Sequence, residues 1–194
     1  MRAPLAIAAA ALALPAVAPA ADPVDARLDG EFRMKGVITR ANKVKGEKEG
    51  DKVTRTWIFR SDCESGPCDE VLLRRHRGET RIDRLTLEHK ATGEYSGKGK
   101  FRFPIRCAGR TYKKGGEARY RIDLTITAAG ADGIATDVKA KYDNTRRINH
   151  TQCGDDADLG RDGARYTGSL KGTDGGTDGG TGGTDGGTGG ATPP

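Results

Sequence analysis

The chain has 194 residues, with 33 basic and 27 acidic side chains, a formal net charge of +6, and four cysteines. Between two unusual ends lie about 150 residues, which is the length of one domain and argues against a multidomain architecture. Nothing after the N-terminal segment is apolar enough to span a membrane, so we expect a soluble mature protein.

Residues 1–21 have the pattern of a secretory signal peptide. Met1 and Arg2 supply a short positive start, and an Ala/Leu-rich apolar run covers 5–14. Pro15 then interrupts the run, and Ala18-Pro19-Ala20 gives the small-residue pattern of a cleavage site. An uncleaved membrane anchor is the alternative, but the segment is short, rich in alanine and broken by proline. We therefore predict a secreted, extracytoplasmic protein.

Residues 172–194 consist almost entirely of Gly, Thr and Asp and end in Pro193-Pro194. Such a segment has no apolar side chain large enough to offset the entropy cost of ordering it. We predict a disordered tail at 172–194, which leaves 22–171 as the exported domain. Without Arg2 and the three tail aspartates, the net charge of that domain rises to +8.

Four cysteines in an exported chain predict two disulfides, for which three pairings are open. We favour Cys63–Cys68, which closes a tight loop, and Cys107–Cys153, which closes a long one. A zinc site is the alternative, but no pair has Cys-x-x-Cys spacing and the three histidines are scattered.

Apolar and polar residues alternate through the first half of the domain in short runs typical of strands. The apolar positions, in chain order, are Phe32, Met34 and Ile38; Val53, Trp57 and Phe59; 71–73; Ile82, Leu85 and Leu87; and Phe101, Phe103 and Ile105. Arg55 interrupts the second run, and the phase of the fourth breaks near Arg84. Val37 beside Gly36 predicts a bulge, and Pro104 predicts an edge position or a bulge.

The clearest alternation comes late, in two long runs at 118–128 and 134–142 around a turn at 129–133. A last run at 164–170 closes the domain, and no stretch after residue 21 has sustained helical periodicity. We predict an all-β fold with eight or nine strands, as an antiparallel barrel or strongly curved meander. A β-sandwich is the alternative.

One stretch joins the second run to the third: Trp-x-Phe-x-x-x-Cys-x-Ser-Gly-Pro-Cys, from Trp57 to Cys68. It predicts a hairpin whose loop is closed by a local disulfide. The stretch resembles small exported β-domains of actinobacterial-type secreted proteins and lipoproteins that carry a similar hairpin. The resemblance implies export, disulfides and β-structure, and it carries no assigned chemistry.

Catalytic and metal motifs are weak. No Gly-x-Ser-x-Gly, His-Glu-x-x-His or phosphate-loop pattern occurs, so we predict no enzyme, no catalytic residues and no cofactor. The best metal candidates are clustered aspartates that could hold calcium: Asp155, Asp156, Asp158 and Asp162. The cluster does not fit an EF-hand loop, and a solvated turn is the alternative.

Arg74, Arg75 and Arg77 form a basic cluster that could bind phosphate or carboxylate groups. An exposed, charged strand end is the alternative, and the absence of interleaved aromatic residues argues against nucleic acid. We predict a monomeric, non-enzymatic binding module of the cell envelope, whose partner would be an anionic envelope polymer. The alternative is a carrier that holds a small apolar ligand inside a barrel, and a hydrolase is a remote one.

Overall fold

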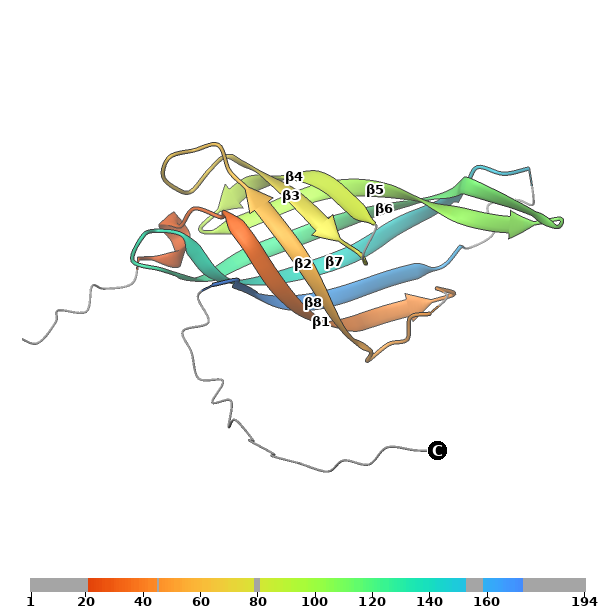
Figure 1. The fold of residues 1–194 in the computed structure, drawn as a ribbon, viewed down its shortest axis with the longest axis horizontal. Helices are drawn as coiled ribbons and strands as arrows, with labels where there is room; N and C mark the ends of the chain where they lie inside the picture. Colours follow the sequence, from red (N-terminus) through yellow and green to blue (C-terminus); the bar gives the residue numbers. More distant parts are fainter. Residues whose placement is uncertain (1–20, 45, 79–80, 153–158, 173–194) are drawn as a thin grey trace, which may run out of the picture.

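The computed structural model describes residues 21–44, 46–78, 81–152 and 159–172. Eight antiparallel strands follow one another around a closed barrel (Figure 1). They are β1 (Gly30–Asn42), β2 (Lys52–Arg60), β3 (Glu70–His76), β4 (Ile82–Ala91), β5 (Glu94–Cys107), β6 (Arg110–Ala129), β7 (Ala135–Asn149) and β8 (Arg161–Leu170). The prediction of a barrel is confirmed, and the sandwich alternative is excluded.

The barrel closes where β1 pairs with β8, from Phe32 opposite Leu170 to Asn42 opposite Arg161. Each strand alternates inward and outward residues, because successive side chains of a strand point to opposite faces. The predicted late hairpin is confirmed as β6 and β7, which enclose the predicted turn. The bulge predicted near Pro104 is also confirmed, since the β5–β6 register shifts between Phe103 and Ile105.

Two predictions of strand phase were wrong. Val37 points outward in unbroken alternation, and the bulge of β1 lies between Ile38 and Arg40. Gly36 takes the inward position in this alternation. Glycine is needed there because a β-carbon would lie 2.4 Å from the ring of Tyr166. In β4 the alternation is unbroken at Arg84. Ile82 is exposed, and the inward residues are Asp83, Leu85 and Leu87.

One end of the barrel is closed by the N-terminal segment. There the short helix η1 (Pro23–Asp25) leads into Ala26 and Leu28, both fully buried, while Arg27 bridges to Ile134. The loop closed by the confirmed Cys63–Cys68 disulfide packs against this segment, and the Arg27 side chain donates to the carbonyl of Cys63 at 3.2 Å. This closed end lies at the left of Figure 1, where β2–β3, β4–β5 and β6–β7 connect.

Apolar side chains fill the interior next to the closed end. Trp57 and Phe59 are fully buried, and the Trp57 ring lies 5.2 Å from that of Tyr166. The other fully buried apolar residues include Phe32, Met34, Val71, Leu73, Leu87 and Ile122. The opposite end, where β1–β2, β3–β4, β5–β6 and β7–β8 connect, is called the open end below. No helix in the described part of the chain is long and apolar enough to cross a membrane.

Candidate functional site

The interior changes character toward the open end, where a cavity of about 410 Å³ lies inside the barrel. Strands β2, β3, β5, β7 and β8 and the connections at this end contribute to its wall. Five arginines, two carboxylates and four aromatic residues are prominent in the lining: Arg55, Arg75, Arg77, Arg81 and Arg147; Glu47 and Asp162; and Phe101, Phe103, Tyr142 and Tyr166. We call this space the barrel cavity.

The deepest charged pair joins Arg75 of β3 to Asp83 of β4. Arg75 is 4% exposed and its guanidinium donates to the Asp83 carboxylate at 3.0 Å. The guanidinium also lies over the rings of Tyr120 and Tyr142, 4.6 and 4.4 Å from their centroids. Burial alone would lower the pKa of Arg75, but the two tyrosines and Asp83 raise it above its ordinary value. Arg75 is therefore a fixed positive charge at the bottom of the cavity.

Arg77 binds the same carboxylate from the outer side. It donates to Asp83 at 3.1 Å, and its Nε lies 2.5 Å from the second carboxylate oxygen. Its guanidinium stacks on Phe101, 3.7 Å from the ring centroid. One aspartate thus holds two arginines in place, and the stacking leaves planar donors beside an aromatic wall.

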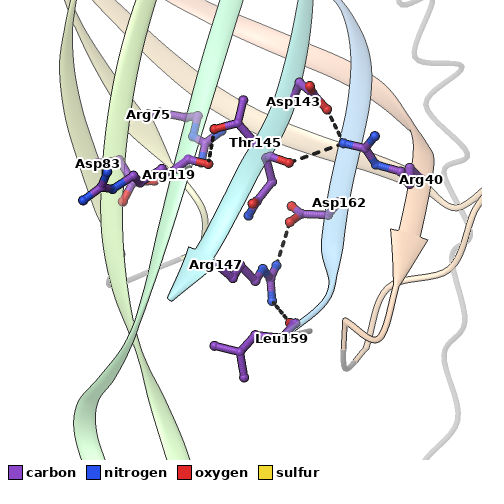
Figure 2. Close-up of polar contacts among 10 residues, drawn as sticks. Arg40, Arg75, Asp83, Arg119, Asp143, Thr145, Arg147, Leu159 and Asp162 are labelled. Carbon is purple, nitrogen blue, oxygen red and sulfur yellow. Dashed lines mark hydrogen bonds and ion pairs between the residues drawn. The ribbon is translucent and has the colours of Figure 1, made fainter. Parts of the chain in front are cut away.

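A second pair lies on the opposite side of the cavity (Figure 2). Arg147 of β7 donates to Asp162 of β8 at 2.6 Å and to the Leu159 carbonyl at 3.5 Å. The Arg147 guanidinium lies 5.3 Å from the Phe103 ring centroid. Both side chains are about one-tenth exposed, so the pair is largely shielded from solvent.

Several buried polar atoms in this part of the barrel have no hydrogen-bond partner in the described structure. They include both amide atoms of Asn144, the hydroxyl of Tyr120, and the Nε atoms of Arg75 and Arg147. Asn144 is fully buried and Tyr120 is 1% exposed. Nearly all buried polar groups in proteins are hydrogen-bonded. Of these residues, Arg75 and Arg147 line the barrel cavity, so a ligand or ordered water in the cavity could supply the partners of their guanidinium groups.

Burial shapes the protonation of the other cavity residues. It raises the pKa of Tyr120 to about 12 and also raises the pKa of Tyr142 and Tyr166, so all three phenols are neutral near pH 7. Burial also raises the pKa of Glu47, and nearby Asp162 adds to this, against the opposing effect of the surrounding arginines. The cavity therefore combines permanent positive charge with a carboxyl that takes up a proton readily.

The predicted arginine cluster is divided by the structure. Arg74 lies on the outer phase of β3, whereas Arg75 points into the barrel. Arg77 comes directly after β3, and its side chain also lines the barrel cavity. The alternative of an exposed strand end was wrong for Arg75, because it shares the inward phase of Val71 and Leu73.

The metal prediction rests mainly on residues outside the described part of the chain. Asp155, Asp156 and Asp158 lie there, and the fourth candidate, Asp162, is paired with Arg147. Among the described residues, no group of three or more His, Cys, Asp or Glu could hold a metal. Cys153 also lies outside the described residues, so the Cys107–Cys153 pairing stays a prediction, although Cys107 is disulfide-bonded.

Sequence reasoning missed Asp83 and Arg147 as parts of this site, although a signal was present for Asp83. Asp83 has the phase of Leu85 and Leu87, and Arg55, noted only as an interruption, has the phase of Trp57. A charge on the apolar phase of a strand is expected to point into the barrel.

No protein-family model, no curated protein and no solved structure matches this chain. The resemblance of the Trp57–Cys68 hairpin to exported β-domains therefore stays a prediction.

Proposed function

We propose that this protein is a non-enzymatic binding protein of an extracytoplasmic compartment that carries a small anion with an aromatic or apolar body. The ligand would lie in the barrel cavity. The observation that carries the proposal is the cavity itself, because it combines a surplus of arginine with buried polar atoms that lack partners. The Cys63–Cys68 disulfide fits an oxidising compartment, and secretion remains part of the proposal.

The charge of the cavity favours an anion. Asp83 and Asp162 together hold three of the five arginines. Arg55 and Arg81 have no carboxylate within 4.0 Å in the described part of the chain, so the cavity keeps a positive surplus even with Glu47 ionised. Arginine suits this role because its planar donors bind carboxylate, phosphate or sulfonate oxygens in pairs.

The walls and size favour a small ligand with an apolar part. A cavity of about 410 Å³ is at the lower end of the range for small-molecule sites. Phe101, Phe103 and Tyr166 supply aromatic surface beside the arginines. The alternative function that the sequence left open was a carrier of a small apolar ligand, but the apolar half of the barrel is filled by side chains. A charged head group is therefore the chemistry that we now propose.

Native mass spectrometry and calorimetry test the proposal on the full chain purified from culture medium. The first measurement looks for a co-purified small molecule. The second compares benzenesulfonate with benzyl alcohol, which lacks the charge, and with methanesulfonate, which lacks the ring. We expect benzenesulfonate to bind most tightly, because only it uses both the arginines and the aromatic walls.

A matched pair of double variants locates the site. Arg55→Gln/Arg81→Gln removes two cavity charges without leaving a carboxylate unpaired and should weaken benzenesulfonate binding about tenfold or more. Arg33→Gln/Arg110→Gln removes two exposed charges outside the cavity and should have little effect. Equal affinity for benzyl alcohol, or equal losses in both double variants, would refute an anion site in the cavity.

A further inference from the structure

A second feature lies on the outside of the barrel, where a groove of about 1100 Å³ crosses β2, β1, β8, β7, β6 and β5. These strands lie side by side in this order around the barrel (Figure 1). Seven basic residues line the groove and only two acidic ones, Glu94 and Asp123. The basic residues are Lys35, Lys52, Lys90, Arg121, Lys139, Lys141 and Arg165. We call this feature the outer groove.

Strand register brings the cations of the outer groove into rows. Lys141 of β7 lies directly opposite Arg165 of β8, and Arg165 lies opposite Val37 of β1. Val37 in turn lies opposite Lys52 of β2, so one row crosses four neighbouring strands. With strands about 4.8 Å apart, this row is about 15 Å long. Lys35 and Lys139 flank Thr167 in the next row.

Most of these cations form no ion pair with another described residue. Asp123 binds Arg121 at 2.7 Å and also accepts from Ser96. By contrast, five cations form no ion pair in the described part of the chain: Lys35, Lys52, Lys139, Lys141 and Arg165. Like charges directly opposite each other, as in Lys141 and Arg165, oppose strand pairing, while on its other side Lys141 lies opposite Asp123 of β6, which binds Arg121. A partner that supplies negative charge would relieve this repulsion.

We infer that the outer groove is a docking surface for a linear, phosphate-bearing polymer in an extended conformation. The row, about 15 Å long, holds three cations, Lys141, Arg165 and Lys52, which match successive charges of such a chain. Lysine predominates among the unpaired cations, and its ammonium group binds phosphate as a point charge. This site is independent of the barrel cavity, which lies on the opposite face of the same wall.

Two other anionic partners fit the groove less well. Single-stranded nucleic acid is bound by aromatic side chains on which its bases stack, and no exposed aromatic residue lines the groove. A lipid surface is favoured by apolar side chains that enter the membrane. Among the described residues of the groove, Val37 is the one large apolar residue that is exposed, at 43%.

Inorganic polyphosphate of defined length is the probe, and its binding to the full chain is measured by calorimetry. Lys139→Gln/Lys141→Gln/Arg165→Gln removes three unpaired charges of the groove. Arg106→Gln/Lys113→Gln/Lys114→Gln removes three exposed charges on the β5–β6 hairpin and is the matched control. Thermal unfolding checks both variants, and the groove variant should be at least as stable as the native chain because it removes a like-charge pair.

We expect the groove variant to bind polyphosphate at least tenfold more weakly, whereas the control stays close to the native affinity. With about five phosphate contacts, raising the salt from about 50 to about 200 mM should weaken native binding about 100-fold. Equal losses in both variants would show a general charge effect and overturn the inference. So would tighter binding to single-stranded DNA of similar length or to vesicles of anionic phospholipid, because the groove would then serve another class of partner.

Discussion

The ion pair between Arg75 and Asp83 gives the strictest test of the charged interior. Both side chains are about 5% exposed, and the Arg75 guanidinium lies over two tyrosine rings. Asp83→Asn would keep the shape of the side chain and remove its charge. Arg75 would then be a buried cation without a counter-ion, which costs about 3–5 kcal/mol in the free energy of unfolding.

A double-mutant cycle separates the charge effect from packing. The cycle compares Asp83→Asn and Arg75→Met with the double variant Arg75→Met/Asp83→Asn. The double variant removes the buried cation as well, and methionine can pack against the rings of Tyr120 and Tyr142. The double variant should therefore be more stable than Asp83→Asn alone, with a coupling energy of about 2–3 kcal/mol. An exposed pair provides the control: Asp143→Asn, which loses the contact with Arg40 (Figure 2), should cost less than about 1 kcal/mol.

Urea unfolding, monitored by the fluorescence of Trp57, measures these differences in unfolding free energy. Trp57 is the single tryptophan of the chain and is fully buried in the barrel, so its fluorescence reports unfolding. The slope of unfolding free energy against urea should stay constant, so that changes in midpoint report stability. If Asp83→Asn costs no more than Asp143→Asn, or if the double variant loses the full sum of the single losses, Arg75 and Asp83 are not coupled in the interior.

Three further predictions concern single residues. Burial raises the pKa of Tyr120 from 10.0 to about 12, so the unfolded chain ionises first and stability should fall by roughly 2–3 kcal/mol as the pH rises from 10 to 12. Tyr120→Phe, which loses a hydroxyl without a partner, should remove that part of the fall in urea titrations. Burial also raises the pKa of Glu47. Protonation removes a negative charge from the cavity, so the calorimetric affinity for benzenesulfonate should rise as the pH falls toward 4.5. Glu47→Gln should increase the affinity at pH 7 and make it less dependent on pH. Gly66→Ala would place a β-carbon 2.5 Å from the backbone of Ala26 and should lower the unfolding free energy by about 1–3 kcal/mol, unlike Ser65→Ala in the same loop.

The strands could be predicted because alternation with a period of two is local and visible in one sequence. The run from Ala118 to Ala128 and its partner on β7 needed no long-range information. The closure of the barrel did, because it depends on the pairing of β1 with β8, whose paired residues are 119 to 138 positions apart in the chain. Barrel and sandwich use the same strand patterns, so the sequence left both open.

The cavity was harder to predict, because side chains from most of the strands line it at the same level along the barrel axis. The arginine cluster was recognised, but Arg75 and Arg77 were treated together with Arg74 as one surface patch. The phase of Leu73 assigns Arg75 to the interior, and the phase of Leu85 assigns Asp83 to the same side. Such charged residues on the apolar phase indicated a polar interior, but only strand register could bring them into contact.

Alternation along each strand lets one wall serve two ligands. On β8, Arg165 points into the outer groove and the next residue, Tyr166, points inward and lines the barrel cavity. Tyr166 contributes to both linings, but the two sites share no charged residue, so both ligands should bind at once. In saturating polyphosphate, the calorimetric affinity for benzenesulfonate should change by no more than about twofold, as expected for separate sites. Competition between them would instead show that the same arginines bind both anions, and the outer groove would then lose its separate role.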